Sequence, residues 1–141
     1  MSPTLTHLDL YENRIESLPF TQSLASLTYL DLSCNAIRET GGGVLSPLVN
    51  CTELYLTANK LKLIDGLEAC TSLAILELGC NRLRSIENLA PLPKLKELWL
   101  AKNKIVAIEN LDHLTQLTKL SLQSNRLTET SNLSTLTLLV E

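Results

Sequence analysis

Carboxylate and aromatic side chains recur at nearly constant intervals along this chain of 141 residues. One series, with intervals of 24, 22 and 22 residues, consists of Asp31, Tyr55, Glu77 and Trp99. Three further residues of the same kinds stand two positions before members of that series: Tyr29, Glu53 and Glu97. Tyr and Trp rings supply much of the binding energy at protein interfaces, and carboxylates pair with basic groups of a partner. The chemistry expected of these seven residues is therefore non-covalent recognition.

Groups suited to covalent catalysis are few. The two histidines are His7 and His113, and no H-E-x-x-H, G-x-S-x-G, Rossmann or P-loop pattern is present. The acids recur once per interval, with no separate pair for acid/base work. The four cysteines form no C-x-x-C pair, so we expect reduced structural thiols and no zinc site. We expect neither an enzyme nor a cofactor.

These side chains are carried by six copies of one short phrase. Each copy fits L-x-x-L-x-L-x-x-N-x-(L/I), with Cys in place of the first Leu in the third, and the copies begin at Leu5, Leu27, Cys51, Leu73, Leu95 and Leu117. This is the pattern of leucine-rich repeats, in which each unit buries its apolar face only by stacking on its neighbours. We therefore predict a single leucine-rich repeat domain over residues 1–141.

The alternation within each phrase predicts a short strand, and stacking makes a parallel concave sheet of about six strands. Apolar residues recur every third position on the return path, as in Ile105, Ile108 and Leu111. That period favours short 3₁₀ or helical turns on the convex side. The predicted fold is a right-handed α/β solenoid, and Gly41–Gly43 is interpreted as a convex insertion in the longer second repeat.

An asparagine holds the same place in every phrase. The six are Asn13, Asn35, Asn59, Asn81, Asn103 and Asn125. An amide side chain both donates and accepts, so it can bond the backbone of its own turn and of a neighbouring turn. We predict that the six asparagines form a structural ladder through the solenoid.

Charge and hydropathy limit the partners. The net charge of -3 and a pI near 5.4 argue against a nucleic-acid partner. The sequence contains no apolar run long enough to span a membrane and begins without a signal-peptide pattern, so we expect a cytoplasmic or nuclear protein and no membrane partner. The basic residues after the asparagines, namely Arg14, Lys60, Arg82, Lys104 and Arg126, are interpreted as a solvated edge that pairs locally with acids.

The 22-residue period and the I-E-N-L segments at Ile86–Leu89 and Ile108–Leu111 resemble one subclass of leucine-rich repeats. It is the subclass of the regulatory subunit of type 1 protein serine/threonine phosphatase. The resemblance covers all six repeats and is closest from Leu73 to Thr128. It implies a non-catalytic solenoid in the cytosol and nucleus whose concave face binds the phosphatase catalytic subunit.

In that family the contact is made by the residue at the fifth place of successive phrases, counted from the first residue of each phrase. Acids and aromatic rings alternate at this place. The matching residues here are Asp31, Tyr55, Glu77 and Trp99, although the family has Phe where this chain has Tyr55 and Trp99. Similar repeats occur in axonemal, cytoskeletal and ribonucleoprotein assemblies, so a scaffold of that kind is the alternative. We see no polar cap at either end of the solenoid, which suggests a fragment or self-association through open terminal layers.

Overall fold

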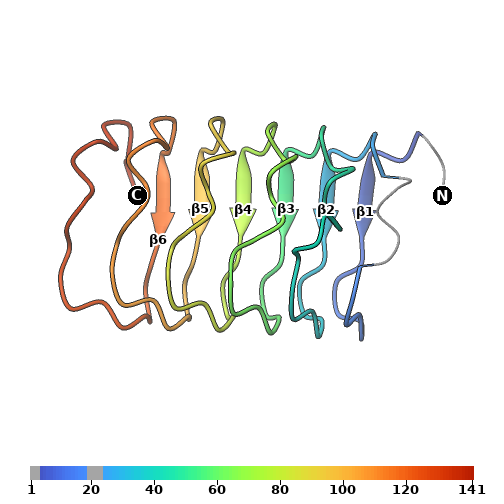
Figure 1. Cartoon of the computed structure of the whole chain (residues 1–141), viewed down its shortest axis with the longest axis horizontal. Helices are drawn as coiled ribbons and strands as arrows, with labels where there is room; N and C mark the ends of the chain where they lie inside the picture. Colours follow the sequence, from blue (N-terminus) through green and yellow to red (C-terminus); the bar gives the residue numbers. More distant parts are fainter. Residues whose placement is uncertain (1–3, 19–23) are drawn as a thin grey trace.

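A computed structural model describes residues 4–18 and 24–141 as a stack of repeats along one axis (Figure 1). The strands are β1 (His7–Asp9), β2 (Tyr29–Asp31), β3 (Glu53–Tyr55), β4 (Ile75–Glu77), β5 (Glu97–Trp99) and β6 (Lys119–Ser121). They form one parallel sheet in the order β1-β2-β3-β4-β5-β6. The six-stranded parallel solenoid is confirmed.

Each strand places its central leucine in the core and its other two side chains on the opposite side. In β4, for example, Leu76 is fully buried, whereas Ile75 and Glu77 are half-buried. The register aligns Leu54 of β3 with Leu76 and Leu76 with Leu98 of β5. A strand of three residues is sufficient because one apolar residue per strand covers the core side of this narrow solenoid.

The return path is made of single hydrogen-bonded turns. In the fifth repeat the amide of Leu114 donates to the carbonyl of Leu111, and the amide of Leu117 donates to the carbonyl of Leu114. One turn thus ends where the next begins, whereas a 3₁₀ helix needs overlapping bonds from consecutive residues. The predicted 3₁₀ or helical turns are not confirmed, because the described residues contain no helix. The apolar period of three is instead the spacing of these linked turns.

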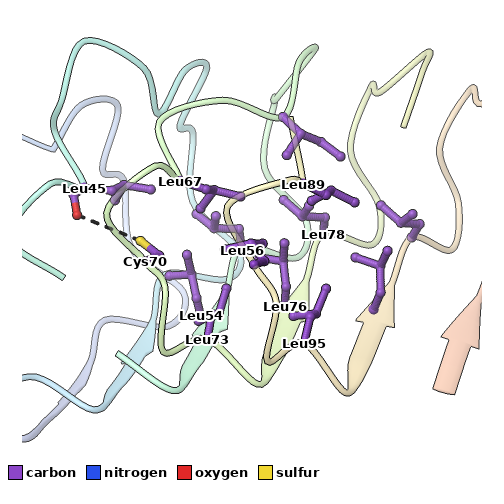
Figure 2. Close-up of a cluster of buried hydrophobic side chains, with 14 of the residues drawn as sticks. Leu45, Leu54, Leu56, Leu67, Cys70, Leu73, Leu76, Leu78, Leu89 and Leu95 are labelled. Carbon is purple, nitrogen blue, oxygen red and sulfur yellow. Dashed lines mark hydrogen bonds between the residues drawn. The ribbon is translucent and has the colours of Figure 1, made fainter. Parts of the chain in front are cut away.

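The core is one continuous cluster of leucine and isoleucine side chains that runs through the stack (Figure 2). Cys51 and Cys70 are buried within it, and the Cys70 thiol lies 3.9 Å from the carbonyl oxygen of Leu45. Burial raises the pKa of Cys51 to about 12 and that of Cys70 to about 11. Both thiols therefore stay protonated near neutral pH and behave as small apolar residues.

The repeat asparagines connect neighbouring turns through their side chains. The Asn81 amide donates to the carbonyls of Leu56, Leu78 and Gly79, and its oxygen accepts from the amide of Leu61. Asn35, Asn59, Asn103 and Asn125 also bond both their own turn and a neighbouring one. Asn13, in the first described repeat, bonds only Leu10 and Tyr11.

A second row of asparagines, on the return path, was not expected from the sequence. Asn88, Asn110 and Asn132 have φ angles of 59°, 58° and 60°. Each side chain donates over 2.7 Å to a carbonyl of the preceding repeat, at Ile64, Ile86 and Ile108 respectively. Asparagine tolerates this left-handed conformation better than most residues. These asparagines, two of them in the I-E-N-L segments and Asn132 in the sequence T-S-N-L, therefore tie three return paths to the ones before them.

Gly66 takes the place of that asparagine in the third repeat. Its φ is +72°, and a Cβ there would lie 2.0 Å from the carbonyl oxygen of Thr40. We expect Gly66→Ala to lower the free energy of unfolding by at least about 2 kcal/mol, because the methyl group must displace backbone in addition to adopting an unfavourable φ. Urea denaturation followed by circular dichroism measures this loss.

The matched control for Gly66→Ala is Gly42→Ala. Gly42 has a similar φ of +69° but no atom within 4 Å of its added Cβ. The control therefore carries the backbone penalty without the clash, and equal losses in the two variants would contradict the proposed contact with Thr40.

Gly41–Gly43 lie in the return path between β2 and β3, where Thr40 is buried and its hydroxyl donates over 2.8 Å to Asp65.

The terminal layers are more exposed than the middle of the stack. Leu8 of β1 and Leu120 of β6 are half-buried, whereas Leu30, Leu54, Leu76 and Leu98 are buried. At the far end the amide of Leu120 donates to the carbonyl of Glu141, so the last residues lie beside β6. Self-association through these layers stays a prediction.

Candidate functional site

The side of the sheet turned away from the leucine core, called the sheet face here, carries two parallel rows of side chains. The strand pairing places Asp31, Tyr55, Glu77 and Trp99 next to one another in a single row across β2 to β5. The pairing places Tyr29, Glu53 and Glu97 in the adjacent row, with Ile75 between the two glutamates. All seven candidate residues are half-buried. The parallel register therefore brings together residues that are 22 to 24 positions apart in the chain.

Aromatic rings gather over the first three strands. The rings of His7 and Tyr29 stack in parallel with centroids 3.9 Å apart and an interplanar angle of 5°. Tyr29 in turn lies 5.3 Å from Tyr55, with its ring tilted by 41°. His7 was not among the candidate residues, although it stands at the same strand position as Tyr29. The structure adds it to the site as the first ring of the stack.

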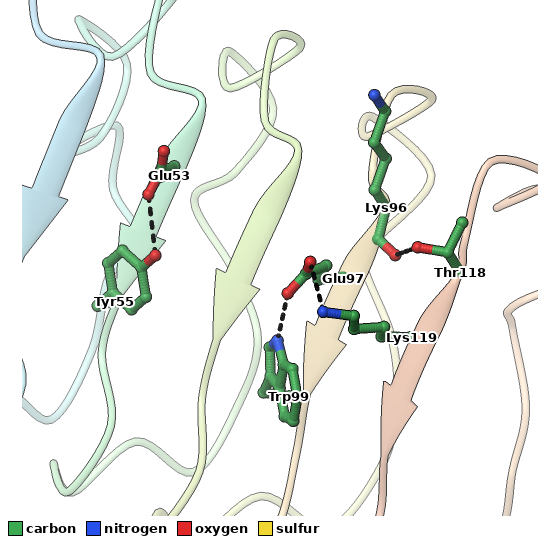
Figure 3. A network of polar contacts seen from close by, with 7 residues as sticks. All are labelled: Glu53, Tyr55, Lys96, Glu97, Trp99, Thr118 and Lys119. Atoms are coloured by element: carbon green, nitrogen blue, oxygen red, sulfur yellow. Dashed lines mark hydrogen bonds and ion pairs between the residues drawn. The ribbon is translucent and has the colours of Figure 1, made fainter. Parts of the chain in front are cut away.

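Two of the rings are held by a glutamate of their own strand (Figure 3). The Tyr55 hydroxyl donates to Glu53 over 2.9 Å, and the Trp99 indole nitrogen donates to Glu97 over 3.1 Å. In both strands the acid stands two residues before the ring, so the two side chains share one side of the sheet. Burial, followed by the bond to Glu53, raises the pKa of Tyr55, and its phenol stays neutral. Rings fixed in this way lose little conformational freedom when a partner binds.

The sheet face carries more negative than positive charge. Its acids are Asp9, Asp31, Glu53, Glu77 and Glu97. Within the part of the chain that the structure describes, the single ion pair joins Lys119 to Glu97 over 3.2 Å. Glu77 accepts only the hydroxyl of Thr57, over 2.9 Å. Asp9 and Asp31 are opposite each other in the register, where like charges repel. A cationic group from a partner would relieve that repulsion.

A separate hollow of about 420 Å³ lies near the amino ends of β4 and β5. Threonine hydroxyls bond the preceding repeat at this level, for example Thr118 to the carbonyl of Lys96, and Ala74 and Lys96 interrupt that series. The lining residues are Ser72, Ala74, Pro93, Lys94, Lys96 and Gln116. None of the candidate binding residues contributes to this hollow.

The described residues show no arrangement for metal binding and no membrane-spanning helix. No group of three or more His, Cys, Asp or Glu side chains in residues 4–18 and 24–141 could hold a metal ion. Over the same ranges no helix is long and apolar enough to cross a membrane. The chemistry that the sheet face offers is ring contact, hydrogen bonding and charge pairing.

A family model described as leucine rich repeat matches residues 3–61 and 71–127. The chain belongs to the leucine-rich repeat family. A second model, for two copies of the repeat, matches residues 49–91. No curated protein matches this leucine-rich repeat chain.

Several solved structures share the fold. Internalin InlF from Listeria monocytogenes has a TM-score of 0.78 and 26% identity over 96% of this leucine-rich repeat chain and 46% of its own. Internalin C2 of the same organism has a TM-score of 0.72 and 29% identity over 96% of this chain and 69% of its own. A TLR13 complex with ssRNA13 has a TM-score of 0.79 and 32% identity over 89% of this chain and 19% of its own.

The chain therefore spans less than half of InlF and about a fifth of TLR13. These matches establish the family and the fold. They carry no specific support for a phosphatase regulatory subunit, so that part of the resemblance remains a proposal.

Proposed function

We propose that this leucine-rich repeat chain is a non-catalytic protein-binding module and that its sheet face binds the catalytic subunit of type 1 protein phosphatase. The observation that carries the proposal is the row Asp31, Tyr55, Glu77 and Trp99, in register across four neighbouring strands. In the phosphatase regulatory subclass that row alternates acid and ring in the same way. The proposal includes the cytosol or nucleus as the place where the two proteins meet.

Each kind of side chain has a separate part in the proposed contact. The rings of Tyr55 and Trp99, held by Glu53 and Glu97, fill apolar hollows of the partner. Asp31 and Glu77 lack a cationic partner within residues 4–18 and 24–141, so they are available to basic groups of the phosphatase. Neighbouring half-buried residues exclude water from these contacts, which strengthens them.

Titration calorimetry with the purified phosphatase catalytic subunit tests the proposal. We expect Trp99→Ala to weaken binding by about 2 kcal/mol or more, roughly 30-fold in Kd, because a large fixed ring is lost from the proposed interface. The matched control is Val106→Ala, which removes an exposed apolar side chain from the return path that follows β5. Equal affinities of the parent, Trp99→Ala and Val106→Ala chains would rule out this use of the face.

The alternative function is a scaffold in axonemal, cytoskeletal or ribonucleoprotein assemblies. Co-purification with tubulin or dynein components in place of the phosphatase would favour it. The similar TLR13 structure contains a single-stranded RNA. The five carboxylates on the sheet face of this chain would repel the phosphates of a nucleic acid bound to that face, so we favour a protein partner.

A further inference from the structure

Positive charge is concentrated beside the sheet face. Figure 1 shows that all six strands end at the same edge of the sheet, where the chain turns into the return path. We consider, in the third to sixth repeats, the residues one before, one after and three after the repeat asparagine. These positions hold seven of the chain's twelve lysines and arginines and no acid. We call these seven the basic edge: Lys60, Lys62, Arg82, Arg84, Lys102, Lys104 and Arg126.

The cations of the basic edge are accessible and unpaired. Five are exposed, and Lys60 and Lys104 are half-buried. The ion pair between Lys119 and Glu97, on the sheet face, is the one that the described residues contain, so no member of the edge takes part in one. The sequence interpretation of Arg14, Lys60, Arg82, Lys104 and Arg126 as a solvated edge included local pairing with acids, and that pairing is wrong, because none of the five forms an ion pair within the described residues.

The backbone spaces these cations regularly. The amides of Lys60, Arg82, Lys104 and Arg126 each donate over 2.8 Å to the corresponding carbonyl of the preceding repeat, at Ile37, Leu61, Leu83 and Ile105. Successive members of this row are therefore about one strand spacing, roughly 4.8 Å, apart. Four like charges at that spacing repel one another, and a partner carrying negative charge along the row would remove the repulsion.

We infer that the basic edge binds an extended, carboxylate-rich segment of the protein that occupies the sheet face. The inference rests on the proposed function and adds a second, oppositely charged contact to it. The row from Lys60 to Arg126 covers about 14 Å, which an extended peptide spans with roughly five residues. Such a partner would present basic and apolar groups to the face and acidic groups to the edge.

A polypeptide fits this edge better than a nucleic acid. Single-stranded nucleic acids bind through cations together with aromatic rings on which bases stack. The basic edge contains no aromatic residue, and the rings of Tyr29, Tyr55 and Trp99 stand among the acids of the sheet face. Phosphates at the edge would therefore lie beside carboxylates, whereas a protein segment can match both signs of charge.

The test uses fluorescence anisotropy with a labelled peptide of ten glutamates and a labelled single-stranded RNA of ten uridines. The edge variant is R82E/K102E, both sites being exposed. Glu12 occupies the turn position of Lys102 in the first repeat with the same φ of 56°, so glutamate is compatible with that backbone. The control variant is K94E/K96E, which makes the same charge change near the opposite ends of the strands. Thermal melts establish that both variants are folded.

We expect the peptide to bind the parent chain at low salt, and to bind R82E/K102E at least about tenfold more weakly. We expect K94E/K96E to differ from the parent by less than about twofold, since it leaves the edge intact. No peptide binding, an equal loss in both variants, or tighter binding of the RNA than of the peptide would each overturn the inference.

The same reagents separate this inference from the proposed function. The peptide assay contains no phosphatase, and Trp99→Ala is expected to leave peptide binding unchanged. Peptide binding that depends on the edge, together with no phosphatase binding, contradicts only the proposed partner. Phosphatase binding that Trp99→Ala weakens and R82E/K102E leaves unchanged contradicts only the role of the edge.

Discussion

Asn81→Ala is expected to lower the free energy of unfolding by about 3 kcal/mol, one of the two largest effects of a single substitution in this chain. Asn81 is 7% exposed, and its side chain makes four hydrogen bonds to the backbone. Alanine removes all four bonds and leaves the amide of Leu61 without a partner, whereas the carbonyls of Leu56 and Leu78 keep their bonds from Asn59 and Asn103. Because the site is buried, water replaces the lost bonds poorly. Urea denaturation of the parent and the variant measures the difference.

Asn13→Ala is the matched control within the same series. Asn13 is exposed and bonds only the carbonyls of Leu10 and Tyr11 in its own turn. Water can replace both bonds, so we expect a loss of less than about 1 kcal/mol. Losses of similar size at Asn13 and Asn81 would show that the asparagines act within single turns and do not connect repeats.

Asn81→Asp separates hydrogen bonding from side-chain volume. The introduced carboxylate has nearly the same shape, but it faces three carbonyl oxygens to which it cannot donate. Its pKa in the folded state must rise above the unfolded value of about 3.9, because burial and these oxygens disfavour the charged form. The variant is therefore expected to lose stability as the pH rises above about 4, and to recover part of it below that pH.

The sequence predicts the fold well because each repeat gives the same local signal. The phrase fixes the positions of Leu76 and Leu98, and stacking the phrases in register gives the observed pairing of those two residues. The alternation within each phrase predicts that residues two positions apart share one side of a strand, and all seven candidate binding residues lie on the sheet face. Periodicity is informative because a parallel stack turns sequence spacing directly into spatial neighbours.

Side-chain contacts between strands and within a strand could not be predicted from the periodicity of the sequence. The hydrogen bond from Trp99 to Glu97 and the stacking of His7 on Tyr29 depend on rotamers, which the pattern leaves open. The bond from Asn88 to Ile64 requires a left-handed residue on the return path. That asparagine was noted only as part of a family resemblance. A period of three also does not distinguish overlapping 3₁₀ bonds from linked single turns.

The repeating fold could also not reveal what is bound. Every strand needs its buried leucine, so the core residues report architecture alone. In the proposed function, the residues that differ from repeat to repeat, such as Ile75 beside Glu53 and Glu97, carry the specificity. The charge separation between the sheet face and the basic edge arises from such differences. The proposed function therefore depends on positions that the repeat pattern leaves unspecified.

Leu76→Ala is the second substitution with a large expected effect, a loss of about 3 to 5 kcal/mol. Leu76 is fully buried at the centre of β4 and lies between Leu54 and Leu98 in the register. Figure 2 shows Leu54 and Leu76 among the buried side chains. Truncation removes three side-chain carbons from a site where both neighbouring repeats are fixed by their own strands and asparagines. The cavity can therefore collapse little, and the cost falls near the top of the range for such changes.

The position of Leu76 in the stack sharpens this prediction. A solenoid is held together by contacts between adjacent repeats, so weakening the fourth repeat uncouples the repeats on either side of it. We expect the urea transition of Leu76→Ala to broaden as well as to move to lower urea, because the two halves then unfold less cooperatively. Leu8→Ala, at the half-buried first strand, should cost less and leave the slope unchanged. A single sharp transition for both variants would mean that the stack unfolds as one unit even when its centre is weakened.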